Sequence, residues 1–453
     1  MTRDPARDLW REFVNPDFVG LLESLHFRRR FVRAEGTKLY DDTGREYTDF
    51  LSGFGVHNIG HNHPRLIAAL RGALDSNGPS MLNMDTPFEA GLLAERLSAL
   101  THPTLCRTVF ANSGAEAVEI AIKTARAATG RKPIVACSNA YHGLTTGALE
   151  LLGCEKYRRP FLTESDDSLR IPFGNAAELD AVCTRLPPAA FIVEPIQAEG
   201  GIHVPAADYL PEAARICRSH GCLLVIDEIQ TGLGRTGRVF ASVAEGATES
   251  SMEPPGDIVL AAKALSGGIV PVAAAIMTAD VWKRAFGGAE RCVLASSTFA
   301  GGRLAMIAGL ETLAILQEEK LAARARQTGD FLFERLRDLA RRHEVVKNVR
   351  GEGLLAGVEF APPPSLFSVA VPKWAREAIY GQVISAILLR DHAIVTQPCS
   401  LAPRVFRVEP PLTVSREEIE RFVQALDQTL SACPSQGAAL LAGLRERLFG
   451  GKD

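Results

Sequence analysis

The chain has 453 residues, of which 46% are hydrophobic and 23% charged, a composition typical of a globular protein with two or three domains. A chain of this length can bury a large core without disulfides or structural metals. Its 50 basic and 53 acidic residues leave a net charge of −3, so the charge balance favours neither nucleic acid nor an anionic membrane surface as a partner. A small-molecule function is indicated instead.

The cysteines and the N-terminus indicate where the protein works. Nine cysteines, an odd number, are scattered without the close spacing of a zinc or redox motif, so we expect free thiols and no metal site. This usage fits a reducing, cytoplasmic location. The first residues, MTRDPARDLWREF, mix both charge signs and lack the apolar core of a secretory signal. No stretch approaches the roughly 20 apolar residues of a membrane span.

In chain order, the first structural signal is a strand-turn-strand pattern with its turn at residues 41–44, DDTG. The middle of the chain then alternates short apolar runs, typical of strands, with helical segments. We predict strands at 108–110, 134–137, 190–193, 222–226, 258–260 and 272–277, with helices at 115–128 and 207–220 among them. Runs that are apolar on both faces and separated by helices favour an α/β fold with a mostly parallel sheet covered on both sides.

The C-terminal third predicts a smaller α+β unit. Residues 302–343 form a long helical pattern, followed by strands within 345–360 and at 405–408, and a helix at 415–430. Residues 361–373 and 433–437 are predicted loops, and 438–449 a last helix. The N-terminal segment would join this smaller unit or lie across the large one. We therefore divide the chain into an N-terminal segment (1–65) assigned to the small domain, a large domain (66–300), an interdomain helix with the C-terminal small domain (301–435), and a helical tail (436–453).

Two predicted strands are followed by groups that suit an anionic, planar ligand. Ser113, Gly114 and Ala115 open the helix after the first strand, and a helix N-terminus offers free N–H donors to an anion. The alternative is an ordinary helix cap. After the next strand, Tyr141 and His142 begin a loop, where an aromatic ring could cover a planar cofactor. Simple packing is the alternative for such an aromatic residue.

Two further strands are followed by an acid and by a lysine. Asp227 ends a buried apolar run, where a carboxylate is costly unless a cation such as a protonated pyridine pairs with it. A helix cap or an internal ion pair is the alternative. Lys263 stands between apolar residues and glycines, where desolvation would make its amine nucleophilic enough for Schiff-base chemistry. A surface lysine with a buried stem is the alternative. Together, the four features supply the groups that pyridoxal phosphate (PLP) needs.

Seven motifs carry a resemblance to a known family. From about residue 30 to 430 the sequence resembles the class III (ornithine/putrescine-type) aminotransferases of PLP fold type I, with homodimers and active sites at the interface. The motifs are NSGAEAVE (112–119), YHG (141–143), EPIQAEGG (194–201), VIDEIQTGLGRTG (225–237), AKALSGG (262–268), SSTFAGG (296–302) and RVEPPLT (407–413). The resemblance implies a large, mostly parallel sheet covered by helices, plus a smaller α+β domain.

The resemblance also implies roles for single residues in the cofactor site. Lys263 would bind PLP covalently and then move the proton between the substrate carbon and the cofactor. Asp227 would pair with the pyridine nitrogen, while Tyr141 stacks on the ring. The remaining cofactor-binding residues would be Ser113, Gly114 and Ala115 at the phosphate, His142 beside Tyr141, Gln230 at the phenolic oxygen, and Thr298 reaching the phosphate from the other subunit.

For the substrate, the resemblance implies a carboxylate-binding Arg407, which suits bidentate recognition. Glu199 would pair with Arg407 and release it for a dicarboxylate such as 2-oxoglutarate, and Phe54 would line the pocket. Two departures lie near the pocket or the dimer interface. Ala198 stands where the family usually has Gly, and Gly302-Arg303 where it usually has Asn-Pro. Both departures bear on which substrate the pocket accepts, whereas the residues expected to bind the cofactor are unchanged.

The expected reaction is transfer of a terminal amino group from a diamine or ornithine-like donor to a keto acid such as 2-oxoglutarate. The first alternative is amination of a lipophilic or specialised-metabolite aldehyde by the same chemistry. A second keeps PLP but changes the reaction to racemisation, aminomutation or decarboxylation, because the cofactor residues are shared. A third is a non-catalytic protein kept for regulation or assembly, against which the presence of both Lys263 and Asp227 argues.

Overall fold

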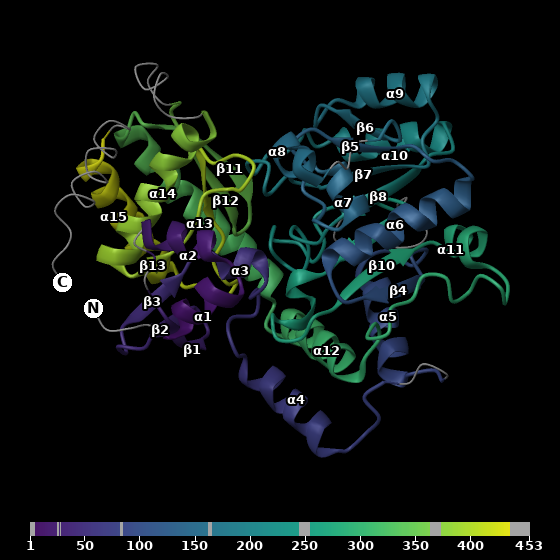
Figure 1. Cartoon of the computed structure of the whole chain (residues 1–453), viewed down its shortest axis with the longest axis horizontal. Helices are drawn as coiled ribbons and strands as arrows, with labels where there is room; N and C mark the ends of the chain where they lie inside the picture. Colours follow the sequence, from purple (N-terminus) through teal and green to yellow (C-terminus); the bar gives the residue numbers. More distant parts are fainter. Residues whose placement is uncertain are drawn as a thin grey trace.

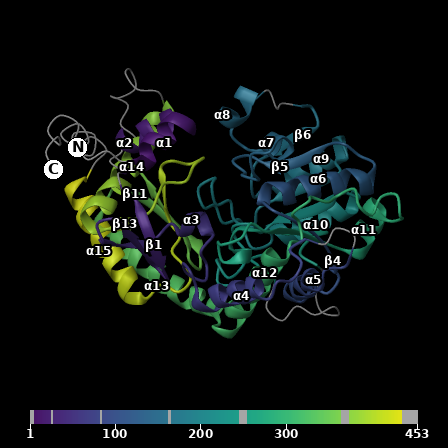
Figure 2. The ribbon, with the colours of Figure 1, turned by 60° about the horizontal axis from the view of Figure 1, so that its bottom comes forward.

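The computed structural model describes residues 5–24, 27, 29–81, 85–161, 165–243, 254–362 and 373–434. The described chain forms two halves that lie side by side, one around a large sheet and the other around two small sheets (Figure 1). Helices α4 (Pro64–Asp75) and α12 (Arg303–Glu318) pack against each other beneath the two halves. A view turned by 60° shows the same arrangement (Figure 2).

The large sheet has seven strands and confirms the expected α/β fold. Its four parallel pairings join β6, β5, β7, β8 and β9, whereas β10 runs antiparallel to both of its neighbours. In spatial order the strands are β4 (Arg107–Ala111), β10 (Ala273–Met277), β9 (Ile258–Ala261), β8 (Leu223–Asp227), β7 (Ala190–Val193), β5 (Ile134–Cys137) and β6 (Ser168–Ile171). The predicted strands of this region are confirmed to within one residue at each end.

Alternating side chains of the large sheet pack into two separate cores. On β7, Phe191 and Val193 belong to one core and Ile192 to the other, because successive side chains of a strand point to opposite faces. One face is covered by α5 (Phe88–Leu100), α9 (Ala176–Arg185) and α10 (Tyr209–Ser219), together with part of α12. The other is covered by α6 (Gly114–Thr129), α7 (Thr146–Leu151) and α11 (Ala279–Phe286). Helices on both faces explain why the inner strands β5, β7, β9 and β10 are apolar throughout.

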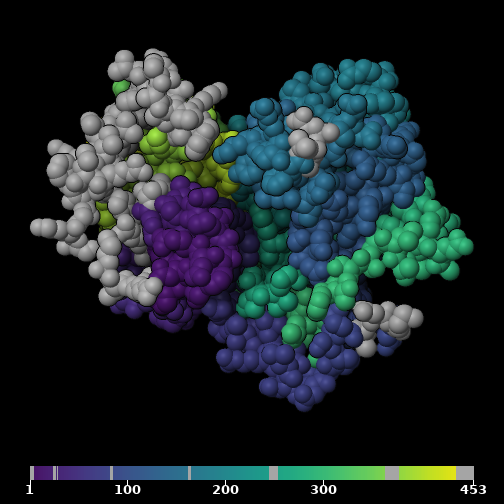
Figure 3. Space-filling model, in the orientation of Figure 1, coloured from purple at the N-terminus to yellow at the C-terminus, as the bar shows by residue number. Residues whose placement is uncertain are grey.

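The other half contains two small sheets. One has the order β1 (Phe31–Glu35), β2 (Lys38–Asp41), β3 (Glu46–Asp49) and β13 (Ile394–Val395), so the N-terminal strands join a C-terminal one. The second consists of β11 (Val346–Glu352), β12 (Leu355–Phe360) and β14 (Val405–Val408), all antiparallel. In the space-filling view the N-terminal segment, in purple, lies against the C-terminal residues in light green (Figure 3). The predicted domain boundaries themselves remain a prediction.

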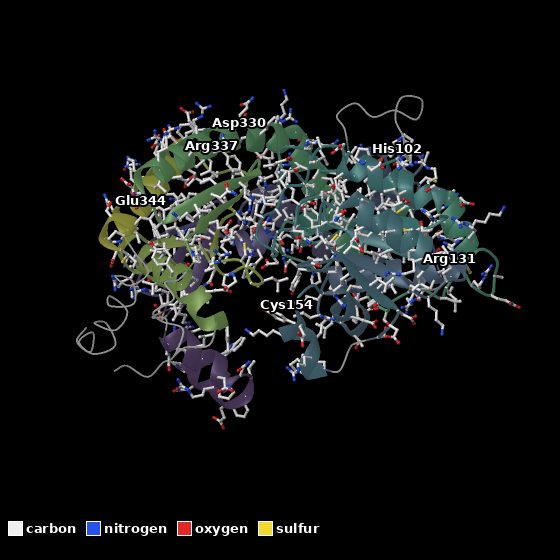
Figure 4. All side chains as sticks on the ribbon, turned by 90° about the horizontal axis from the view of Figure 1, so that it is seen from above. His102, Arg131, Cys154, Asp330, Arg337 and Glu344 are labelled. Carbon is white, nitrogen blue, oxygen red and sulfur yellow. The ribbon has the colours of Figure 1, made fainter. Side chains whose placement is uncertain are left out.

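The remaining helices complete this half and connect it to the large sheet. They are α1 (Pro5–Phe13), α2 (Pro16–Ser24), α3 (Ser52–Gly55), α13 (Leu321–Arg342), α14 (Lys373–His392) and α15 (Arg416–Ala432), with α8 (Glu155–Arg158), η1 (Arg159–Phe161) and η2 (Lys263–Ser266) in the loops of the large sheet. Seen from above, Arg337 and Glu344 lie on one half and His102 and Arg131 on the other (Figure 4).

The structure differs from the sequence-based prediction in three places. The long helical pattern is two helices, α12 and α13, because Lys320 adopts a left-handed backbone (φ 52°) between them. Edge strand β6 and helix α14 were not predicted; β6 is only partly buried, and α14 begins at residue 373, the end of a predicted loop. The predicted helix at 438–449 and the loop residues 363–372 lie outside the described residues.

Other expectations concern absences. All nine cysteines are free, and most are buried. Within the described ranges, no group of three or more His, Cys, Asp or Glu side chains is arranged to hold a metal ion. Nor does any helix in the described part of the chain have the length and apolar character needed to cross a membrane.

Candidate active site

A cavity of about 270 Å³ lies at the carboxyl ends of the parallel strands. Carboxyl ends of neighbouring parallel strands meet at one edge of a sheet, which is where α/β proteins bind ligands. The loops after β5, β7, β8 and β9 therefore converge there. The cavity lining includes most of the predicted cofactor residues: Gly114, Ala115, Tyr141, His142, Asp227, Gln230 and Lys263. A second cavity of about 240 Å³ shares Gly114 and Lys263 with the first and adds Ser113.

Lys263 follows β9 and begins the short helix η2. Its ammonium group donates a hydrogen bond to Oε1 of Gln230. Burial lowers the pKa of Lys263, although the negative charges of Glu409 and Glu199 act in the opposite direction. The backbone of Lys263 is left-handed (φ 47°), which costs a residue with a side chain about 1–2 kcal/mol. The side chain of Lys263 lines the cavity, and a lowered pKa favours the nucleophilic form of its amine; its role as the cofactor lysine remains a prediction.

Asp227 is the last residue of β8 and forms a buried pair with His142. The carboxylate is 3% exposed, with Oδ2 at 2.7 Å from Nδ1 of His142 and Oδ1 accepting the N–H of Ile229 at 3.1 Å. Burial by itself would lower the pKa of His142, but the hydrogen bond and charge of Asp227, with the charge of Glu194, raise it overall. Asp227 thus presents its carboxylate to the cavity, which is the position that a partner of a pyridinium nitrogen needs.

The sequence left open whether the residues before α6 form an ordinary helix cap or an anion-binding N-terminus. The structure shows a cap at Ser113 and leaves the next residues facing the cavity. Ser113 is an N-cap whose Oγ accepts the N–H of Glu116, and the Glu116 carboxylate accepts the N–H of Ser113 at 3.1 Å. The N–H group of Ser113 is therefore occupied. Gly114 and Ala115 begin α6 and line the cavity, where first-turn N–H groups are available to an anion.

Two glycines stand at close approaches around the cavity, and the approach at Gly143 requires glycine. A Cβ on Gly114 would lie 3.0 Å from Ile229, and one on Gly143 would lie 2.6 Å from the Cβ of Ala115. The loop of Tyr141 can therefore approach α6 only because residue 143 has no side chain. Tyr141 itself is tied by its N–H to Oε1 of Glu194 at 3.0 Å. Its ring lines the cavity, so it is placed to cover a planar ligand.

Arg407 and Glu199 form the buried ion pair expected at the substrate end of the site. Nη2 of Arg407 lies 2.6 Å from Oε1 of Glu199, whose other oxygen accepts the N–H of Ser400 at 3.0 Å. Burial would raise the pKa of Glu199, but the positive charges of Arg407 and Lys263 lower it to about 2. The Phe54 ring lies 5.1 Å from the Arg407 guanidinium carbon and is 41% exposed, so it covers this pair from the solvent side.

Thr298 is the predicted cofactor residue that lies outside both cavities. It is exposed, in a loop whose Ser297 hydroxyl accepts a hydrogen bond from the Asn112 side chain at 3.0 Å. The loop therefore contacts the segment that leads into α6. A single chain does not bring Thr298 into its own site, and its role in a partner's site remains a prediction.

Three buried charged residues were missed by the sequence reasoning. Glu194 lines the cavity and, mainly because of burial, has its pKa raised to about 7. Glu409 and Arg235 are fully buried and lie 3.8 Å apart. Both glutamates precede a proline in the quoted motifs, at 194–195 and 409–410, and each directly follows a buried strand. A carboxylate directly after a buried apolar strand is the sequence pattern that could have identified these two glutamates as site residues.

Comparisons with known proteins agree with this geometry. The profile of the aminotransferase class-III family matches residues 23–430. The chain belongs to the class III aminotransferases. This family depends on PLP, and the cavity fits that cofactor. The fit rests on the cavity-lining amine of Lys263, whose pKa is lowered, the carboxylate of Asp227, the first-turn N–H groups of α6 and the ring of Tyr141.

Individual relatives place the chain within this family. It is 35% identical to aminotransferase PigE of Serratia sp. over 94% of its own length, but it spans only about half (54%) of that relative. An ornithine aminotransferase from Toxoplasma gondii, solved with PLP at partial occupancy, is 30% identical with a TM-score of 0.77, covering 95% of this chain and 98% of that one. A PLP-bound amine transaminase from an uncultivated Pseudomonas species is 26% identical with a TM-score of 0.77, covering 89% and 95%.

Proposed function

We propose that this aminotransferase moves a terminal amino group from a diamine or ornithine-like donor to a keto acid such as 2-oxoglutarate. The observation that carries the proposal is the Arg407–Glu199 pair beside Lys263. An arginine can bind a substrate carboxylate with two hydrogen bonds. Paired with Glu199 instead, it is neutralised and leaves the pocket suitable for an amine. One pocket can thus accept both a donor without an α-carboxylate and an acidic acceptor.

The chain's own residues would divide the work as follows. PLP, when bound, supplies the electron sink that stabilises negative charge at the substrate carbon. Lys263 would bind the cofactor and move a proton at that carbon, using an amine whose pKa is lowered by burial. Asp227, oriented by His142, would hold a proton at the ring nitrogen. Gly114 and Ala115, with Ser113, would bind the phosphate, while Gln230 contacts the phenolic oxygen and Tyr141 excludes water from one side of the ring.

A homodimer completes the proposed site. The family resemblance implies that Thr298 reaches the phosphate in the neighbouring subunit. In this chain Thr298 is exposed. Large apolar side chains around it are exposed too, including Val293, Leu294 and Phe299. Exposed apolar patches of this kind mark interfaces between proteins. Sedimentation should therefore give twice the mass of one chain, whereas a monomeric holoenzyme with full activity would contradict the proposal.

The experiment that tests the proposed function is product analysis. Purified holoenzyme is incubated with 2-oxoglutarate and ornithine or putrescine, and the products are identified by mass spectrometry. We expect glutamate and the aldehyde derived from the donor. If no amine on the panel yields glutamate while a long-chain or bulky amine is consumed with another acceptor, the proposed substrates are wrong.

Amination of a lipophilic aldehyde remains a second candidate because of two exposed apolar side chains. Leu144 lines the cavity and is 53% exposed, and Phe54 lies over Arg407 with its ring partly in solvent. An apolar chain could bury both side chains. The product analysis therefore includes long-chain monoamines, and their preferential consumption would favour this candidate.

Arg407→Ala is expected to raise the KM for 2-oxoglutarate at least ~30-fold, since removing one partner of a buried charged hydrogen bond costs about 2–5 kcal/mol. Steady-state kinetics with the donor held at saturation measure this change. Arg407→Lys is the matched control: it keeps the charge but loses the bidentate geometry, so an intermediate KM is expected. An unchanged KM for 2-oxoglutarate in Arg407→Ala would show that the substrate carboxylate binds elsewhere.

A further inference from the structure

Glu409 is a buried carboxylate at the substrate end of the site that the resemblance leaves without a role. It follows β14 and is 0% exposed. The Gln230 side-chain N–H₂ group lies 3.2 Å from each of its two oxygens. On its other sides, Nη1 of Arg407 lies at 3.5 Å and Nε of Arg235 at 3.8 Å. The carboxylate is thus surrounded by two arginines and one amide.

The surroundings of Glu409 hold it in place. Arg235 cannot shift easily, because its guanidinium donates to the carbonyl oxygens of Leu354 and Pro410 and to Oδ1 of Asn58. The backbone of Gly55 is also so close that a Cβ there would lie 2.5 Å from Oε1 of Glu409. The left-handed turn of α3, which includes Gly55, therefore closes over the carboxylate.

Glu199 has fewer partners, although it binds the same guanidinium at a shorter distance. Its carboxylate partners are Arg407 and a single backbone N–H, that of Ser400. Arg407 therefore has one anion that a substrate could displace, Glu199 at 2.6 Å, and one enclosed anion, Glu409 at 3.5 Å. The two carboxylates cannot play the same part when a substrate binds.

We propose that Glu409 is a specificity-determining residue: it stays paired with Arg407 when Glu199 leaves, and thereby weakens the binding of acidic substrates relative to amines without a carboxylate. The inference rests on the proposed function only in taking Arg407 as the carboxylate-binding residue. A substrate carboxylate on Arg407 would face Glu409 across the guanidinium. At an effective dielectric constant of about 20, like charges about 7 Å apart weaken binding roughly 10- to 100-fold.

The test measures binding of glutarate, a dicarboxylate that has neither an amino nor a keto group and so cannot react. Calorimetric titration of the holoenzyme should give a dissociation constant at least ~10-fold lower for Glu409→Gln than for the wild type. In an Arg407→Ala background the same substitution should give no gain, because without the guanidinium the glutarate carboxylate is no longer held near Glu409. Equal or weaker glutarate binding by folded Glu409→Gln would overturn the proposal.

Two further variants keep the result interpretable. Glu228→Gln is the matched control, because Glu228 is also buried after β8 but is bound by Thr231 and Ser242, away from Arg407; its glutarate affinity should equal that of the wild type. If Glu409→Gln fails to fold because Arg235 loses its counter-ion, Glu409→Asp withdraws the charge by one methylene. It should tighten glutarate binding by a smaller factor, and unchanged binding would again overturn the proposal.

The outcome is independent of the donor substrate. Tighter glutarate binding by Glu409→Gln would support the role of Glu409 even if neither ornithine nor putrescine were a donor. Conversely, glutamate formation from either donor, together with unchanged glutarate binding, would leave the proposed function standing and remove the role of Glu409.

Discussion

Lys263→Ala is expected to lower kcat by at least ~10⁴-fold, since the variant loses both its nucleophile and its general acid–base group. Covalent attachment of the cofactor should be lost as well. Borohydride reduction followed by peptide mass spectrometry measures this directly: the wild type should carry a phosphopyridoxyl group on Lys263, and the variant none. The position of Lys263 in the cavity lining and its lowered pKa are the physical reasons to expect attachment at this residue.

Lys283→Ala is a suitable control for this experiment. Lys283 is exposed on α11, one of the helices that cover the large sheet. It is not among the residues that line the cavity. Its removal should leave both cofactor attachment and turnover as in the wild type. Retained turnover in Lys263→Ala, or cofactor bonded to a different lysine in the wild type, would refute the assignment.

Asp227→Asn is expected to lower kcat roughly 10²- to 10³-fold, the range for the loss of one preorganised electrostatic partner. The substitution keeps the shape of the side chain but replaces the carboxylate that lines the cavity and lies 2.7 Å from His142. Single-turnover rates measure the effect on chemistry. The pH dependence of the cofactor absorbance measures whether the ring nitrogen has lost its proton, which a merely structural role would not change.

Asp257→Asn is the matched control for Asp227. Asp257 is a partly buried carboxylate, but it lies at the opposite end of the sheet and accepts the N–H of Leu224 at 2.8 Å. Its replacement should alter thermal stability without changing the cofactor spectrum or the kcat of folded enzyme. If Asp257→Asn and Asp227→Asn lowered kcat equally, the loss would reflect general damage to the sheet, and the pyridinium role would fail.

Much of the large sheet could be predicted because its strands carry a strong local signal. β5, β7 and β8 are buried on both faces and are separated by helices, so their residues are apolar in uninterrupted runs. Cavity-lining residues stand at or after the ends of these strands: Asp227 ends β8, Glu194 follows β7, Tyr141 lies four residues beyond β5, and Lys263 comes soon after β9. This coincidence let the sequence place Tyr141, Asp227 and Lys263 at one edge of the sheet before any contact was known.

The features that could not be predicted depend on contacts between distant parts of the chain. Gln230 and Glu409 are 179 positions apart, and nothing near either residue indicates that they meet. The left-handed turn of α3 forms although Phe54 is unfavourable in that conformation, because tertiary contacts outweigh local preference. The double use of Ser113, as a cap and as a neighbour of the cavity, also appears only when α6 is in place.

The central claim is that one pocket passes an amino group from an amine to an acid through a PLP cofactor on Lys263. The most direct measurement follows the cofactor absorbance of the purified holoenzyme during each half-reaction. A diamine or ornithine should bleach the absorbance of the lysine-bound cofactor, and 2-oxoglutarate added afterwards should restore it. If none of a panel of amines bleaches that absorbance, or if 2-oxoglutarate fails to restore it, the account of this pocket is contradicted.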